Sequence, residues 1–204
     1  MMKHIKKKET CSKTKQNLKQ ISQTYSVLFL LCVLSCQIFY PKWLTIFSLS
    51  ALVMPSVHLT ILTLLVVLIV LAMDDVIDNC SPAFKVHKKL VRQLIGSINT
   101  YQTVYLSIIA AVTEEMFFRV TLQPSLGIVL TSLIVGFVHI KPQLGISLWM
   151  VTSVFCRSVL FGILFYQTRS IYPCVVAHFS LNLIYLLKYQ NDMTNVLKKK
   201  LSKL

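Results

Sequence analysis

Long apolar runs separated by short polar segments form the dominant pattern in this 204-residue chain. Runs of this length predict membrane-spanning helices. Only a helix satisfies its own backbone hydrogen bonds within such a run, so the fold class expected is all-α, a polytopic transmembrane helical bundle. The predicted spans are approximately 25–41, 43–73, 100–123, 127–140, 145–166 and 171–188.

The run 43–73 decides the span count. As one helix it would be about 46 Å long, which is too long for an upright span and short for two spans. Pro55 lies inside the run, and the acidic stretch 74–78 closes it. If both tails and the basic segment 84–97 share one side of the membrane, two crossings precede residue 84 and four follow it. We therefore expect about six spans, or seven if Pro55 divides the run.

Basic residues cluster at both ends of the chain and in one interior segment. The formal net charge is +14, and basic flanks of this kind mark the cytoplasmic side. We expect a basic cytoplasmic tail at 1–24, then spans and a basic amphipathic interfacial segment within 25–98. A catalytic transmembrane core would follow at 99–188, with a second basic cytoplasmic tail at 189–204. Such tails favour contact with anionic membrane lipid over nucleic acid.

Composition supports the membrane interpretation. Apolar residues make up 55% of the chain and charged residues only 14%, whereas soluble domains carry about 25% charged residues. The six cysteines form no C-x-x-C pair and show no zinc spacing, so neither a disulfide framework nor a structural metal is expected. The small size and the style of the tails favour a multi-pass protein of the bacterial inner (plasma) membrane.

Three charged residues interrupt the apolar span 100–123. Each costs roughly 2.5–3.5 kcal/mol at the centre of a membrane helix, so they are expected to face the protein interior. Glu115 and Arg119 are four apart, about 40° on the helical wheel, and are expected to pair. Glu114 is about 140° from Arg119 and needs another partner. We interpret Glu115 and Arg119 as chiefly structural and Glu114 as pointing into a site.

The next span carries His139. A turn is predicted at 124–127 (Pro-Ser-Leu-Gly), whose residues favour reversals. Glu114 lies twelve residues before Leu126 and His139 thirteen after it. An antiparallel hairpin there brings both side chains to the same depth, and the nearby Lys141 places that depth nearer the cytoplasmic face.

The last span carries His178 and Asn182, which are four apart and share one helix face. Hydrogen bonds between helices would be a sufficient role for two such residues. Together with Glu114 and His139 they form a set with a further use. A carboxylate and an imidazole can act as general bases, and imidazole and carboxamide groups can donate to an oxyanion. This combination is suited to adding water to an amide carbonyl.

These motifs resemble those of the CPBP family of intramembrane glutamic proteases, which includes the CAAX prenyl endopeptidases and the Abi proteins linked to bacteriocin immunity. The resemblance spans about residues 100–188. The matching motifs are Glu114-Glu115-Met116-Phe117-Phe118-Arg119, Val135-Gly136-Phe137-Val138-His139 and His178-Phe179-Ser180-Leu181-Asn182.

The resemblance implies a hydrolase that cleaves peptide bonds in the membrane without a metal or other cofactor. Glu114 and His139 would activate water, and His178 with Asn182 would form the oxyanion hole. The substrate would be a membrane-associated peptide or protein, prenylated or not. Two positions depart from the family pattern: Val135 stands where the family usually has Phe, and Val120 where it often has Gly.

Two other interpretations stay open at this point. The same polar residues could hold together a non-catalytic membrane scaffold or an immunity-type protein. A zinc-dependent membrane protease using Glu114, His139 and His178 as ligands is the other, although the chain lacks the H-E-x-x-H arrangement.

Overall fold

The computed structural model of the chain describes residues 2–39, 57–82, 85, 98–140 and 148–201. Within these ranges the chain is helical and contains no strand, which confirms the all-α prediction. The elements are α1 (Met2–Phe39), α3 (Val57–Cys80), α5 (Thr100–Glu115), the π-helical segment η2 (Met116–Leu122), α6 (Gln123–Val138), α7 (Leu148–Thr168) and α8 (Tyr172–Leu201).

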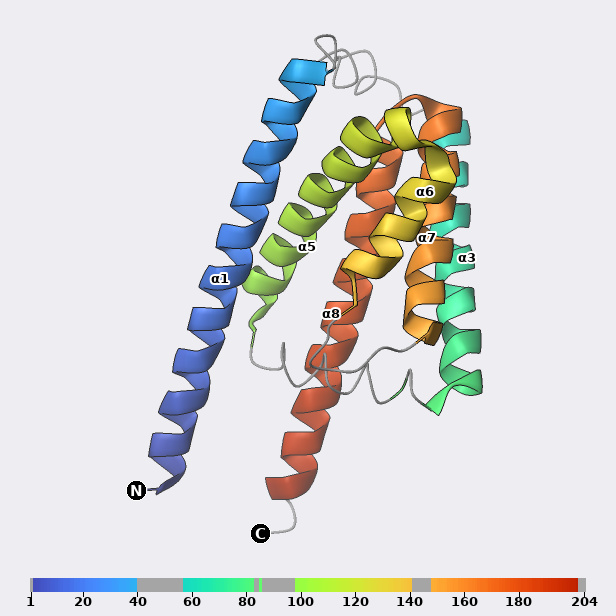
Figure 1. Ribbon diagram of the computed structural model, residues 1–204. Helices are drawn as coiled ribbons and strands as arrows, with labels where there is room; N and C mark the ends of the chain where they lie inside the picture. Colours follow the sequence, from blue (N-terminus) through green and yellow to red (C-terminus); the bar gives the residue numbers. More distant parts are fainter. Residues whose placement is uncertain (1, 40–56, 83–84, 86–97, 141–147, 202–204) are drawn as a thin grey trace.

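The helices form a bundle of the membrane type. Three helical stretches among the described residues are long and apolar enough to cross a membrane: Val57–Cys80, Thr100–Val138 and Leu148–Thr168. The stretch Thr100–Val138 contains α5, η2 and α6, and Figure 1 shows that the chain reverses direction within it. The total of six or seven crossings stays a prediction.

Large apolar side chains cover much of the outer surface. Leu30, Leu68, Val129 and Phe137 are each more than half exposed. An aqueous surface rarely presents so many large apolar groups, whereas lipid is their natural surrounding. The protein is therefore a membrane protein.

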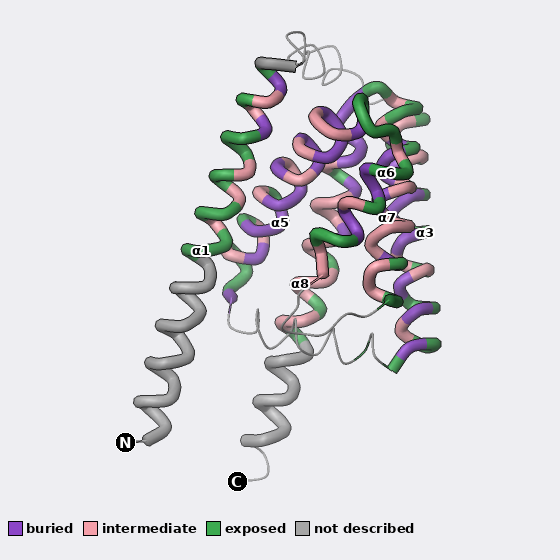
Figure 2. Tube along the Cα trace, in the orientation of Figure 1, coloured by how far each residue is buried: buried purple, intermediate pink, exposed green. Residues whose placement is uncertain are grey.

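Two apolar clusters hold the bundle together. One joins α3, α7 and α8 through residues such as Val70, Phe161 and Leu181. The other packs Cys32 and Cys36 of α1 against η2. The described part of α1 is otherwise mostly exposed, whereas buried positions are frequent on α5 (Figure 2). In Figure 1, α1 begins and α8 ends at the same end of the bundle.

Several predicted helix bounds differ from the observed ones. Helix α1 extends back to Met2 and α8 forward to Leu201, because Lys, Gln and Leu continue a helix readily outside the apolar run. The acidic stretch 74–78 does not end its helix, since α3 continues to Cys80. The first part of the run 43–73, with Pro55, and almost all of the segment 84–97 lie outside the described residues.

The predicted reversal at 124–127 is present at Gly127. Its φ of 74° and ψ of 176° interrupt α6 with a conformation that side chains other than glycine rarely adopt. At the other end of this hairpin, α5 begins with a capping box. The side chain of Asn99 accepts a hydrogen bond from the backbone N–H of Gln102, and the side chain of Gln102 accepts one from Asn99.

Candidate active site

Glu114 lies at the end of α5 with its side chain 13% exposed. Its two carboxylate oxygens face different neighbours. The Tyr25 hydroxyl donates a hydrogen bond of 2.8 Å to Oε1. Oε2 lies 3.5 Å from His139 Nε2 and 4.0 Å from His178 Nε2. Helix geometry alone assigned Glu114 no partner. In the structure its Oε2 faces two imidazoles, and neither is close enough for a short hydrogen bond.

His139 follows the last residue of α6 and remains 34% exposed. Its Nδ1 lies 2.8 Å from the Val135 carbonyl oxygen, which can only accept, so Nδ1 carries a proton in this bond. That arrangement orients Nε2 toward Glu114. The equal depth of Glu114 and His139, predicted from the hairpin, is confirmed by their contact.

Glu115 makes the ion pair expected from its spacing. Arg119 Nε donates to Glu115 Oε2 at 2.9 Å, and the two side chains are 1% and 2% exposed. Arg119 also donates to Gln123 at 3.0 Å and to Ser158 at 2.8 Å. Hydrogen bonds to three such partners offset most of the free-energy cost of removing the guanidinium from water. This pair therefore forms part of a buried hydrogen-bonded network that joins α5, η2, α6 and α7.

His178 connects the two glutamates. Its Nδ1 lies 2.8 Å from Glu115 Oε1 and its Nε2 4.0 Å from Glu114 Oε2. Because a carboxylate accepts, Nδ1 donates to Glu115, and the ring is fixed with Nε2 directed to the side of Glu114. Arg119 therefore orients His178 through Glu115, much as a carboxylate orients a catalytic histidine.

Asn182 lies one helical turn after His178 on α8 and is half-buried. Within the part of the chain that the structure describes, no hydrogen bond engages its carboxamide. The carboxamide therefore has two free N–H donors on the α8 face that also carries His178.

The π-helical segment η2 begins directly after the two glutamates and includes Arg119. A π-turn adds a residue to the helical repeat and changes the direction of the side chains that follow, and such turns are frequent at functional sites. Here Thr121 donates back to the Met116 carbonyl, five residues earlier, at 3.4 Å.

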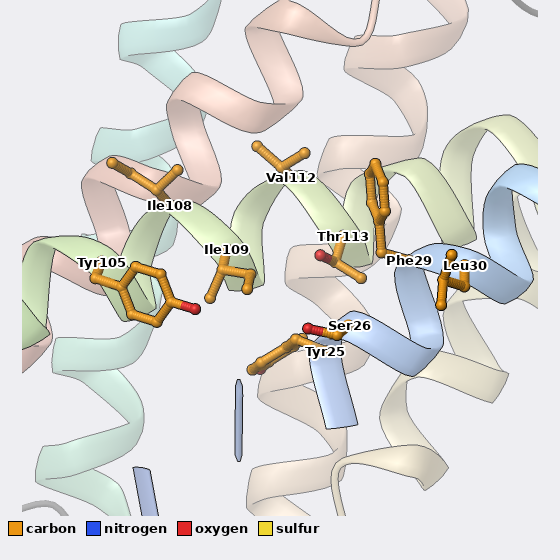
Figure 3. Close-up of a pocket in the computed structure, with 9 residues that line it drawn as sticks. All are labelled: Tyr25, Ser26, Phe29, Leu30, Tyr105, Ile108, Ile109, Val112 and Thr113. Atoms are coloured by element: carbon orange, nitrogen blue, oxygen red, sulfur yellow. The ribbon is translucent and has the colours of Figure 1, made fainter. Parts of the chain in front are cut away.

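An apolar cavity of about 500 Å³ lies between α1 and α5 and reaches Thr113, the residue before Glu114. Its walls include Phe29 and Tyr25 from α1 and Ile108 and Val112 from α5 (Figure 3). Tyr25 thus has two neighbours: its ring lines the cavity and its hydroxyl bonds Glu114.

Among the described residues, no group of three or more His, Cys, Asp and Glu side chains has a geometry suited to a metal ion. Glu114, His139 and His178 are among the described residues and do not form such a group.

Comparison with known families decides the class of protein. Residues 96–184 match the family described as type II CAAX prenyl endopeptidase Rce1-like. This segment belongs to the CAAX protease family. No curated protein and no solved structure matches the chain. The resemblance expected from the motifs is confirmed, and the protein is a membrane-embedded protease.

The CAAX protease segment contains Glu114, His139, His178 and Asn182 but not every residue at the site. Tyr25, which contacts Glu114, comes from α1, outside that segment. Sequence reasoning missed it because a single Tyr at the start of an apolar run has no spacing pattern. It also missed the bond from His178 to Glu115, which depends on how α8 is rotated against α5.

A second buried polar cluster lies outside the CAAX protease motifs. Asp74 of α3, 3% exposed, accepts hydrogen bonds from Ser153 at 2.6 Å and Arg157 at 2.8 Å, both on α7. The Tyr185 hydroxyl of α8 donates to the same carboxylate. The acidic stretch interpreted as a helix end thus supplies the carboxylate that joins three helices.

Proposed function

We propose that this protein is an intramembrane endopeptidase in which Glu114 is the general base for attack of water on a peptide bond. The observation that carries the proposal is the position of the carboxylate. It is nearly buried, faces two imidazoles at 3.5 and 4.0 Å, and leaves both without a direct short hydrogen bond to it. A water molecule beside this group can lie within hydrogen-bond reach of the carboxylate and of an imidazole nitrogen at once.

In the proposed reaction, a water molecule hydrogen-bonded to both Glu114 and His139 loses a proton to Glu114 as its oxygen bonds the carbonyl carbon. The tetrahedral intermediate then collapses with cleavage of the C–N bond, and the same proton passes to the leaving amine. General acid–base catalysis of this type contributes about 10²–10⁴-fold to a rate.

His178 and Asn182 would stabilise the negative oxygen of the intermediate. His178 suits this role as the imidazolium, in which Nδ1–H stays bound to Glu115 and Nε2–H, on the side of Glu114, can donate to the oxyanion. Asn182 suits it because its N–H donors have no partner among the described residues. Donors held in place before the reaction lose no free energy to reorganisation during it.

The proposed substrate is a membrane-associated peptide or protein, prenylated or not, in a bacterial plasma membrane. The basic tails favour a cytoplasmic location for both ends of the chain, and α1 begins and α8 ends at one end of the bundle. The site would accordingly open toward the cytoplasmic half of the membrane.

The proposal is tested with the purified full chain and a quenched fluorescent CAAX peptide, supplied with and without a farnesyl group. Wild type should cleave at least one form, and Glu114→Gln should cleave neither while accumulating and unfolding as wild type does. A chelator should leave the rate unchanged. Loss of activity with the chelator, restored by zinc, would overturn the metal-independent mechanism.

Natural substrates can be sought by comparing peptide fragments in membranes from cells that carry wild type or Glu114→Gln. We expect fragments that occur only with wild type. The competing scaffold hypothesis predicts no such fragments. It also predicts that alanine at His178 or Asn182 preserves the biological phenotype whenever the protein accumulates.

A further inference from the structure

Tyr25 is the one residue outside the matched segment whose contact with Glu114 is described in the structure. The hydrogen bond from its hydroxyl to Glu114 Oε1 is 2.8 Å long and joins residues 89 positions apart. The bond connects α1 with the end of α5, where α5 passes into η2. A contact this short between distant helices requires that α1 has a defined register against α5.

Polar contacts at two other heights set that register. The hydroxyls of Ser22 and Tyr105 lie 2.9 Å apart, three residues before Tyr25 on α1. Farther along α1, Cys32 and Cys36 lie 3.3 and 3.4 Å from the Thr121 hydroxyl of η2. Because apolar surfaces between membrane helices allow sliding, such contacts specify which residues meet. Together with the Tyr25 bond they give three levels of polar contact in one register, so the loss of the Tyr105 hydroxyl alone leaves two levels that keep Tyr25 opposite Glu114.

The consequence for Glu114 follows from its torsion angles. The last torsion of a glutamate is broad and roughly two-fold, so an unrestrained carboxylate turns easily. A hydroxyl bound to Oε1 restricts this rotation and keeps Oε2 directed at His139 and His178. Catalysis is sensitive to such alignment, since a displacement of about 1 Å can cost about 100-fold in rate.

We propose that Tyr25 is a positioning residue that fixes the Glu114 carboxylate, so that α1 completes the active site that the matched segment only partly supplies. The proposal rests on the function proposed above for Glu114. It assigns Tyr25 no contact with the reacting atoms. Its effect passes through the orientation of one carboxylate oxygen.

The chain offers a matched pair of variants. Tyr25→Phe removes the hydroxyl bound to Glu114 and keeps the ring that lines the cavity. Tyr105→Phe removes a hydroxyl from the same α1–α5 interface without touching Glu114. Any general loosening of α1 should affect both variants. Misalignment of Glu114 should affect only the first.

In the assay with the farnesylated quenched CAAX peptide, we expect Tyr25→Phe to lower kcat by about 10-fold to 100-fold with KM unchanged. Tyr105→Phe should keep the wild-type kcat, and both should unfold at the wild-type temperature. Equal losses in the two variants would overturn the proposal, and so would wild-type kcat in Tyr25→Phe. If Glu114→Gln is fully active, the proposed function fails instead, which separates the two failures.

Infrared spectroscopy gives a second readout that needs no substrate. The difference between wild type and Glu114→Gln, with carbon-13 in the glutamate carboxyl groups, identifies the band of Glu114. Tyr25→Phe should shift this band because one oxygen loses its donor, and Tyr105→Phe should not. An unshifted band in Tyr25→Phe would overturn the proposal whatever the peptide assay shows.

Discussion

Two carboxylates in this bundle, the buried Asp74 and the partly buried Glu114, have opposite surroundings. Asp74 accepts from Ser153 and Arg157 at 2.6 and 2.8 Å and from the Tyr185 hydroxyl as well. Both of its oxygens are engaged, and an arginine balances its charge. Nothing remains for it to bind, so this cluster is a polar connection between α3, α7 and α8.

Glu114 also accepts from a tyrosine, but its second oxygen faces His139 and His178 at 3.5 and 4.0 Å. No cation of fixed charge contacts it among the described residues. A buried carboxylate alone therefore does not mark an active site. We propose that the active-site carboxylate is the one held by a hydroxyl on one oxygen and facing two imidazoles with the other.

Removal of Asp74 should have the largest effect on stability. In Asp74→Ala the Arg157 guanidinium loses its counter-charge, which for a buried pair costs about 3–5 kcal/mol. We expect the lower end, because the Arg157 side chain is 21% exposed. The free energy of unfolding in mixed detergent measures this loss.

A double variant tests whether the Asp74 cluster is only structural. If the cluster is only a structural connection, Asp74→Leu with Arg157→Leu should recover most of the stability and the peptidase activity, because an apolar pair can replace a buried ion pair. A stable double variant without activity would show that this cluster takes part in the chemistry, and the contrast with Glu114 would be lost.

Asn182→Ala should lower the rate of peptide cleavage and leave the stability of the protein nearly unchanged. Its carboxamide has no hydrogen bond to lose among the described residues, so the unfolding free energy should change little. Loss of one oxyanion donor typically lowers kcat by about 10²–10³-fold. A normal kcat in this variant would remove Asn182 from the proposed oxyanion hole.

The smallest effect is expected at the hairpin that brings Glu114 and His139 together. Gly127 has a φ of 74°, and a Cβ there would meet no atom within 4 Å. Gly127→Ala should therefore cost only backbone strain, about 1–3 kcal/mol. Gly162→Ala is a useful comparison, since its Cβ would lie 2.8 Å from an Ile128 methyl group. The thermal midpoint should fall in both.

The sequence predicted the contacts that have a regular spacing. Glu115 and Arg119 are one turn apart, and their pairing is local. The contact of Glu114 with His139 follows from counting residues on either side of one turn. Both predictions needed only helix geometry and a reversal near residue 127.

Contacts between helices that are not adjacent along the chain could not be predicted in this way. The bond from Tyr25 to Glu114 spans 89 positions and the bond from Tyr185 to Asp74 spans 111. The rotation and register of two packed helices decide such contacts, and a lone tyrosine carries no sign of its partner. The π-helical turn at 116–122 likewise has no signal in its residues.

The central claim is that Glu114, and not its neighbour Glu115, is the base. The most direct measurement is the kcat of purified Glu114→Gln on a quenched CAAX peptide that the wild type cleaves. The amide keeps the size of the side chain and cannot take a proton from water, so we predict a loss of about 10²–10⁴-fold with an unchanged unfolding temperature. A folded Glu114→Gln with the wild-type kcat would contradict the claim.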